Sequence, residues 1–186
     1  MKRLFIAIPL KLNNLAKQSI LEIQTQLSQN SIKWVSFDNL HLTLQFIGDT
    51  NENDIVTIIK ILDNLQEYFN KFEVQLSGLY TFGNRDNPNV LWTKWIDNNQ
   101  SKNLAKLLNE QISLMNNVKS NDKFIPHLTL GRVKRISDLS NFNEIISNNA
   151  NLSLGRYTID EIILFESKLK PTGPEYLTLH KIKAYK

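Results

Sequence analysis

The chain of 186 residues carries 22 Lys and Arg against 18 Asp and Glu, a formal net charge of +4, and apolar residues make up 41% of it. This balance is typical of a folded globular protein and excludes a collagen-like, coiled-coil or disordered chain. The absence of cysteine excludes disulfides, thiolate zinc sites, iron–sulfur clusters and a cysteine nucleophile. No segment approaches the ~20 apolar residues of a membrane span, so the sequence predicts a cytoplasmic protein with no membrane partner.

The first half of the chain predicts a strand, a long helix, two further strands and a second helix. The first apolar run is rich in β-forming residues and ends at Pro9, which favours a buried strand over a secretory signal. Apolar residues then recur at helical spacing, and Asn51 or Asn53 can cap the second helix. The expected elements are strand 3–8, helix 12–27, strands 32–35 and 41–47, a turn at 48–49, and a helix that ends at residue 65.

The second half begins with a strand pair whose connection, Gly-Asn-Arg-Asp-Asn-Pro at 83–88, has the composition of a loop. Ser137 or Asp138 can cap a short helix. The expected elements are strands 72–79 and 90–95, helix 99–114, strand 124–133, helix 138–146, and strands 152–158, 161–166 and 176–182. This order predicts an α/β protein of the α+β type, with residues 1–186 forming one domain from two diverged copies of a duplicated half.

Two of the three histidines begin the same tetrapeptide, His-Leu-Thr-Leu, at His41 and at His127, 86 residues apart. Side chains of a strand alternate between its faces, so each His shares a face with the Thr two residues later, about 7 Å away. Those residues are Thr43 and Thr129, and the leucines between them face a core. A duplicated pattern in a chain with so few histidines favours a functional role over a structural one.

If the two halves pack about a pseudo-twofold axis, His41 and His127 face each other across a cleft. In-line displacement at phosphorus needs a base on one side and an acid on the other, and His can serve either role near neutral pH. The hydroxyls of Thr43 and Thr129 can donate hydrogen bonds to the non-bridging oxygens. A structural pair and a metal site are the alternatives. His-x-Thr supplies only one good metal ligand, so we expect no metal and no cofactor.

These motifs and the blocks around them resemble the 2H phosphoesterase superfamily, and most of all its bacterial and archaeal RNA 2′,3′-cyclic phosphodiesterases, historically called 2′-5′ RNA ligases. The resemblance runs over almost the whole chain, and neither motif departs from the family pattern. It is carried by residues 3–9, Trp34, Val35, residues 39–44 and 46–48, Phe124, residues 126–132, and Ser167, Lys168, Leu169, Pro171, Gly173 and Tyr176.

The resemblance implies a bilobal fold, with antiparallel sheets flanked by helices around a central cleft. It also implies an enzyme that opens a 2′,3′-cyclic phosphate on RNA or a nucleotide to a 2′-phosphomonoester without a metal ion. His127 would activate water, His41 would protonate the departing 3′ oxygen, and Thr43 and Thr129 would hold the phosphate. A pseudo-symmetric site leaves the opposite acid–base assignment open. RNA ends or nucleotides are the expected partners, and the protein is expected to be a monomer.

Arg132 matches a family position and could add positive charge beside the phosphate. Strict alternation places it on the face opposite His127 unless Gly131 bulges the strand. In a regular strand Phe46 lies on the same face as the leucines of the first motif, so we expect it to pack in the core rather than to stack on a base. The third histidine, His180, has no Thr partner and is expected to be structural.

Two other functions stay open on the sequence. One is RNA ligation or another 2H cyclic-phosphate activity at the same site, and the other is a non-catalytic protein that binds RNA ends in the same cleft. Salt-sensitive RNA binding without turnover would favour the second of these. The net charge of +4 suits a phosphate substrate but does not identify one.

Overall fold

The computed structural model describes residues 1–84, 86–115, 124–171 and 173–185. Two antiparallel sheets form its centre, one with strand order β3-β1-β8-β9 and one with order β2-β6-β5-β4-β7. The elements are β1 (Lys2–Pro9), α1 (Asn14–Gln26), β2 (Ser31–Trp34), β3 (His41–Thr50), α2 (Glu52–Leu65), β4 (Phe72–Asn84), β5 (Asn87–Ile96), α3 (Gln100–Ile112), β6 (His127–Arg135), α4 (Leu139–Asn148), β7 (Ser153–Ile159), β8 (Glu161–Lys170) and β9 (Gly173–Lys183). Short 3₁₀ turns lie at Phe37–Asn39 and Gln66–Tyr68.

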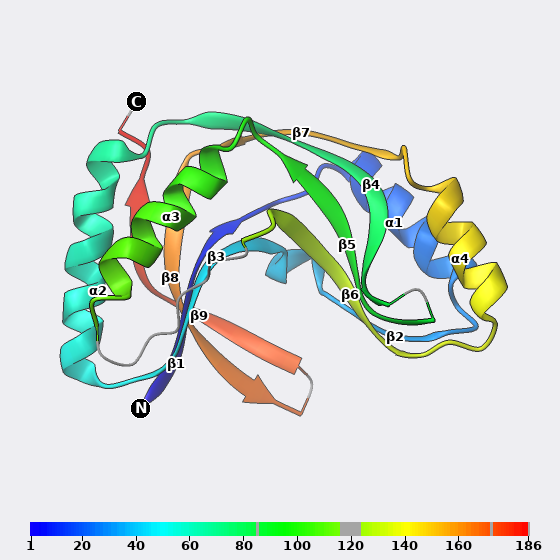
Figure 1. Ribbon diagram of the computed structural model, residues 1–186, viewed down its shortest axis with the longest axis horizontal. Helices are drawn as coiled ribbons and strands as arrows, with labels where there is room; N and C mark the ends of the chain where they lie inside the picture. Colours follow the sequence, from blue (N-terminus) through cyan, green and yellow to red (C-terminus); the bar gives the residue numbers. More distant parts are fainter. Residues whose placement is uncertain (85, 116–123, 172, 186) are drawn as a thin grey trace.

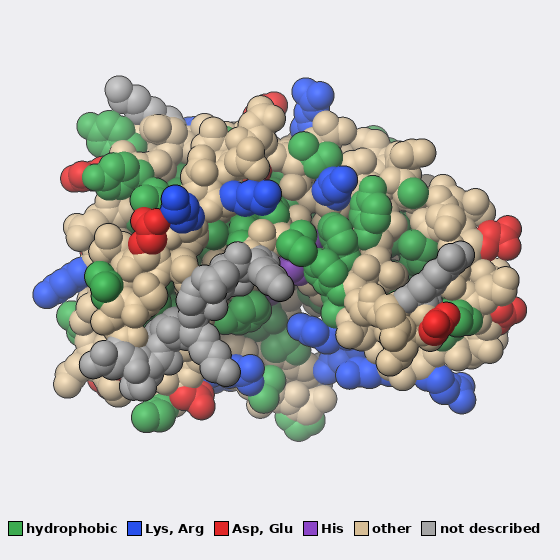
Figure 2. Space-filling view, viewed as in Figure 1, with side chains coloured by type: hydrophobic (Ala, Val, Ile, Leu, Met, Phe, Trp, Pro, Cys, Tyr) green, Lys and Arg blue, Asp and Glu red, His purple; other side chains and the backbone are tan. Residues whose placement is uncertain are grey.

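The helices lie on the outer sides of the two sheets (Figure 1). Helices α2 and α3 cover the four-stranded sheet, and α1 and α4 cover the five-stranded sheet. The other faces of the two sheets look toward each other. In the space-filling view a histidine side chain is visible in the hollow between the lobes (Figure 2). No helix in the described part of the chain is long and apolar enough to cross a membrane.

Side-chain caps begin three of the four helices that the described residues form. The side-chain oxygens of Asn13, Asn51 and Asp138 accept hydrogen bonds from the backbone N–H three residues later, at 2.9, 2.9 and 3.0 Å. These bonds satisfy N–H groups that have no partner within the helix. The predicted caps at Asn51 and Asp138 are therefore confirmed.

The predicted fold class, an α+β protein with two antiparallel sheets flanked by helices, is confirmed, and the elements follow the predicted order. Three local predictions were wrong. The turn at 48–49 is part of β3, because Gly48 adopts a φ of +89° and lets the strand continue in a shifted register with β1. Strands β4 and β5 extend into the expected loop at 83–88, and β6 begins at His127, not at residue 124.

Candidate active site

Both His-Leu-Thr-Leu sequences begin a strand, one at the start of β3 and the other at the start of β6. In each copy the two leucines are buried, while the His and the Thr lie half-buried on the opposite face. Strand β3 is an edge of its sheet, β6 lies one strand in from the edge of the other sheet, and the two strands are in contact across the lobes. The structure thus brings His41 and Thr43 to one side of a cleft, with His127 and Thr129 on the other.

The two imidazoles are held in the same way. Nδ1 of His41 donates a hydrogen bond to the carbonyl oxygen of Asn39 at 2.7 Å, and Nδ1 of His127 donates one to the carbonyl oxygen of Ile125, also at 2.7 Å. A carbonyl can only accept, so each Nδ1 carries a proton. The remaining nitrogen, Nε2, is then a base in the neutral ring and an acid in the protonated ring. Each histidine can therefore take up or release a proton at Nε2.

Aromatic rings surround both histidines and restrict how each imidazole turns. The ring centroid of His41 lies 5.1 Å from that of Phe5 and 5.3 Å from that of Tyr176, which meets it at 89°. The ring of His127 lies 4.8 Å from Phe82 at 88° and 5.9 Å from Trp92. Edge-to-face contacts of this kind are favourable for aromatic pairs. They orient the two rings and remove water from around them.

Burial lowers the pKa of both histidines below the ordinary value of 6.5, because the charged imidazolium loses hydration. For each ring the hydrogen bond to a backbone carbonyl opposes this effect. The charge of His127 lowers the pKa of His41 further, whereas the guanidinium of Arg132 does so for His127. A charged His127 therefore makes protonation of His41 less favourable.

The hydroxyls of Thr43 and Thr129 lie on the cleft side of their strands. In the described residues no side-chain hydrogen bond involves Thr43 or Thr129, although both are half-buried. A hydroxyl that faces a cleft without a protein partner can donate its hydrogen to a bound oxygen. Both threonines are therefore free to bind an anion between the histidines.

A bulge in β6 brings Arg132 to the face that carries His127 and Thr129. Thr129 and Gly131 pair with consecutive residues of β5, so Leu130 is an extra residue. Leu130 and Gly131 are both buried, and the alternation resumes with Arg132 exposed on the side of Thr129. The positive charge of Arg132 lowers the pKa of His127. It also opposes the effect of burial, which raises the pKa of Tyr176.

The equivalent bulge in β3 changes the position of Phe46. Thr43 and Gln45 pair with consecutive residues of β1, so Leu44 is the extra residue, and both Leu44 and Gln45 are buried. Phe46 therefore lies on the side of Thr43 and is 66% exposed. The expectation that Phe46 packs in the core was wrong. It occupies the position five residues after its histidine, as Arg132 does after the other.

Sequence reasoning did not identify Phe5 and Phe82 as neighbours of the two histidines. Phe5 contacts the ring of His41 across β1 and β3, and the parity of the first strand could have placed it there. Phe82 lies next to the segment whose composition favoured a loop, which hid its place in β4. His180, which we expected to be structural, donates from Nε2 to Asp63 on α2 at 2.7 Å.

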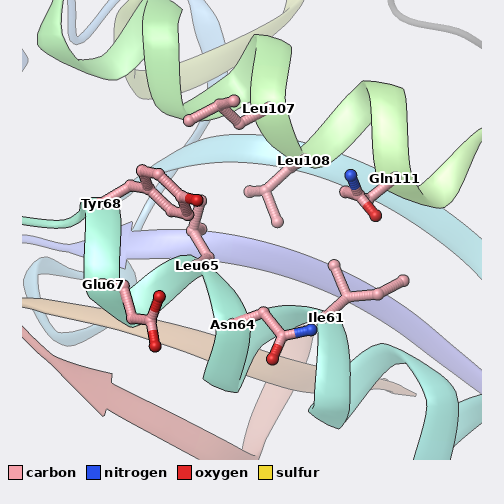
Figure 3. A pocket seen from close by; sticks show the side chains of 8 residues that line it. All are labelled: Ile61, Asn64, Leu65, Glu67, Tyr68, Leu107, Leu108 and Gln111. Atoms are coloured by element: carbon pink, nitrogen blue, oxygen red, sulfur yellow. The ribbon is translucent and has the colours of Figure 1, made fainter.

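A cavity of about 320 Å³ lies apart from the histidines, between α2, the turn that follows it, and α3 (Figure 3). Leu65 and Leu108 line it together with Asn64, Glu67 and Gln111, and it contains no histidine. The described residues contain no group of three or more His, Asp or Glu side chains that could hold a metal ion.

An imidazole and a hydroxyl from each of two facing sheets define a phosphoesterase of the two-histidine class. The chain belongs to the LigT-like phosphoesterase family, whose model (LigT like Phosphoesterase) matches residues 10–92 and 96–176. It is 31% identical over 174 residues to an RNA 2′,3′-cyclic phosphodiesterase of Methanocaldococcus jannaschii, covering 94% of this chain and 96% of the relative. It is 30% identical over 181 residues to an enzyme of the same name from Thermotoga maritima, covering 96% and 94%.

Solved structures show the same fold. The protein TT0787 of Thermus thermophilus superposes with a TM-score of 0.80 at 26% identity, covering 97% of both chains. Escherichia coli LigT complexed with 3′-AMP superposes with a TM-score of 0.75 at 21% identity, covering 100% of this chain and 99% of the other. The two-sheet architecture around the cleft is thus shared along the full length of the chain.

Proposed function

We propose that this chain hydrolyses the 2′,3′-cyclic phosphate at an RNA or nucleotide end, using His41 and His127 as its acid–base pair. The observation that carries the proposal is the matched geometry of the two rings, each with Nδ1 bonded to the carbonyl two residues earlier and Nε2 left for the substrate. Membership of the phosphoesterase family and the names of the relatives support the reaction class. Two histidines supply both proton transfers, so the proposal requires no metal ion and no cofactor.

The step is an in-line displacement at phosphorus. The oxygen of a water molecule attacks phosphorus as Nε2 of His127 takes its proton, the bond from phosphorus to the 3′ oxygen breaks, and Nε2 of His41 gives its proton to that oxygen. The product is a 2′-phosphomonoester with a free 3′ hydroxyl. His127 leaves the step protonated and His41 neutral, and exchange with solvent restores the starting state.

The residues five positions after the two histidines support this assignment of roles. Burial lowers the pKa of His127, and the guanidinium of Arg132 lowers it further, which favours the neutral ring that a general base needs. Phe46, at the equivalent place after His41, carries no charge. Besides burial, only the charge of His127 lowers the pKa of His41, and that charge is absent while His127 is the neutral base. The asymmetry of one position favours His127 as the base and His41 as the acid.

Three further residues complete the proposed substrate site. The hydroxyls of Thr43 and Thr129 donate to the non-bridging oxygens, and the guanidinium of Arg132 adds positive charge as negative charge builds there. The exposed ring of Phe46 lies on the same face, with its centroid 6.4 Å from that of Phe5. A nucleobase stacks on such a ring whatever its identity. Phe46 is therefore proposed as the platform for the terminal base.

The proposal treats residues 1–186 as one bilobal domain that acts as a monomer. Its support is that one histidine comes from each sheet, so a single chain supplies the complete pair. The proposed substrate is RNA, and the proposed location is the cytoplasm.

The test is turnover of a nucleoside 2′,3′-cyclic phosphate in the presence of a chelator, with the product identified as the 2′- or 3′-phosphate. His41→Ala and His127→Ala should each lose at least ~10²-fold of kcat, which is the scale of one acid–base contribution. His180→Ala is the matched control, because its imidazole is bonded to Asp63 outside the cleft, and it should retain activity. Turnover by the double His41→Ala/His127→Ala variant, loss of activity on chelation, a 3′-phosphate product, or binding without turnover would each contradict the proposal.

A further inference from the structure

Two bulges in β6 place its cations on the face of the cleft. The first, at Leu130, brings Arg132 to the side of the catalytic motif. In the pairing of β6 with β2, the partners of Val133 and Arg135 are consecutive residues of β2, so Lys134 is extra and the alternation shifts a second time. Arg135 therefore returns to the same face as Arg132. An unbulged strand would not have placed both arginines on this face.

Strand β2 adds a third cation to this face. Lys33 is the direct cross-strand partner of Arg132, and Arg135 pairs with Ser31. Lys33, Arg132 and Arg135 are all exposed. In the space-filling view, Lys and Arg side chains gather in the lower right over β2 and β6, beside the hollow that shows the histidine (Figure 2). We call these three residues the basic track.

The basic track has no ion-pair partner among the residues that the structure describes. In the described part of the chain, every ion pair lies in the four-stranded sheet, its covering helices or the turn into β8, and none involves the track. Two like charges directly opposite on neighbouring strands destabilise a sheet. An anion bound over Lys33 and Arg132 removes that repulsion, and a chain of anions does so along the whole track.

We propose that the basic track binds the backbone phosphates of the RNA strand that leads to the terminal cyclic phosphate. This inference rests on the proposed function, because it takes the cyclic phosphate to lie between the histidines. The track begins at Arg132, three residues after Thr129, and continues to Arg135 at the end of β6. A single-stranded polyanion fits a row of cations better than an isolated phosphate does. The preferred substrate is therefore an oligoribonucleotide and not a mononucleotide.

The alternative path for the strand is a cavity whose lining includes the two residues before His127. This cavity, of about 310 Å³, is lined by Trp92, Lys94, Lys102 and Pro126. It also contains Asp97, and the ammonium of Lys94 lies 5.6 Å from the centroid of the Tyr80 ring. Its two cations are thus accompanied by a carboxylate. The basic track has three cations and no carboxylate partner in the described residues, which favours it as the path of the strand.

The experiment compares kcat/KM for a 2′,3′-cyclic mononucleotide and for an oligoribonucleotide with the same cyclic end, over a range of salt concentrations. The variant Lys33→Glu/Arg135→Glu spares the residues of the catalytic site. Its matched control is Lys94→Glu/Lys102→Glu, which makes the same change of charge beside the other route. The readout is the ratio of the two kcat/KM values, and turnover of the mononucleotide shows that each variant is folded.

The wild-type protein should prefer the oligoribonucleotide. A plot of the logarithm of the kcat/KM ratio against the logarithm of the salt concentration should fall with a slope of about 0.7 for each phosphate bound. In Lys33→Glu/Arg135→Glu the ratio should fall on the order of tenfold and the slope should weaken by about 1.4, while the mononucleotide value stays unchanged and the control keeps its ratio. The inference is wrong if the wild type shows no preference for the oligoribonucleotide. It is also wrong if the ratio falls as much in Lys94→Glu/Lys102→Glu as in Lys33→Glu/Arg135→Glu, or if it falls only in Lys94→Glu/Lys102→Glu. Failure of the wild type to hydrolyse the mononucleotide would instead contradict the proposed function.

Discussion

Gly131 lies at the bulge that sets the position of Arg132, and Gly131→Ala tests how tightly that bulge is packed. A Cβ at this position would lie 2.9 Å from Cγ2 of Ile32 and 3.2 Å from Cε3 of Trp34. Carbon atoms prefer about 3.5–4.0 Å, so both side chains must give way. Such overpacking costs about 1–3 kcal/mol. Gly131 has no positive φ, so alanine can adopt its backbone conformation. Alanine also lowers the conformational entropy of the unfolded chain, which stabilises the folded protein by about 0.4–1 kcal/mol and offsets part of this cost.

The expected net loss lies between about 0 and 2.6 kcal/mol in the free energy of unfolding, with a midpoint of ~1.3 kcal/mol, and the melting temperature should fall by about 2–4 °C for each kcal/mol. Ile32 and Trp34 flank Lys33, which is the cross-strand partner of Arg132, so a shift of these two side chains disturbs the strand pairing that positions Arg132. We expect kcat/KM for the cyclic phosphate to fall on the order of tenfold, the scale of part of one charge-assisted hydrogen bond.

A double-mutant cycle with Ile32→Ala isolates the steric cause, since alanine has no Cγ2. Urea unfolding followed by circular dichroism gives the free energies for the wild type, the two single variants and the double variant. Gly131→Ala should cost at least ~0.5 kcal/mol less in the Ile32→Ala background. The same cost in both backgrounds, or unchanged kcat/KM in a destabilised Gly131→Ala protein, would refute the reasoning that the packed bulge positions Arg132.

The other expectations concern titration, base binding and the core. kcat/KM should be bell-shaped in pH with its optimum on the acidic side of 6.5, since burial lowers the pKa of both His41 and His127. Arg132→Gln removes a charge that lowers the pKa of His127, so the acidic limb should move to higher pH, and an unmoved limb would argue against His127 as the base. Phe46→Ala should raise KM by an amount that corresponds to a loss of about 1–3 kcal/mol in binding free energy. The free energy of unfolding in urea should stay within ~0.5 kcal/mol of the wild-type value; equal losses of binding and unfolding free energy would mean that Phe46 has a packing role. Leu42→Ala, at a fully buried position, should lower the free energy of unfolding by about 2–5 kcal/mol, and a loss below ~1 kcal/mol would contradict its place in the core.

The regular part of the fold was predictable because local rules and tertiary packing agree there. The period-2 pattern of His-Leu-Thr-Leu correctly predicts buried leucines at 42, 44, 128 and 130. The helical spacing and the Asn51 and Asp138 caps correctly predict α2 and α4. These features depend on residues close together in sequence. The duplicated motif likewise places a histidine at the start of a strand in each lobe.

The irregular part was not predictable in the same way, because bulges depend on how strands pair. Gly131 is a visible signal for the bulge in β6, but the equivalent position in β3 is Gln45, which gives none. Parity therefore placed Phe46 with the core leucines, and the extra residue at Leu44 reverses that placement. The prediction of a loop at residues 83–88 was wrong for a related reason, because pairing between β4 and β5 overrides the loop preference of these residues.

The bulge at Leu44 in β3 and the bulge at Leu130 in β6 also explain why the two halves of the site differ. Each half supplies a histidine with the same backbone hydrogen bond and a threonine on the same face, so the shared frame alone does not distinguish acid from base. The bulge then turns one more residue into the cleft from each half, Phe46 in one and Arg132 in the other. The charge of Arg132 favours a neutral His127, and the same guanidinium begins the row of cations along β6. In the proposed reaction, one position per half thus separates the proton-transfer roles, and in the proposed basic track the same position in β6 sets the side from which a polyanionic strand approaches.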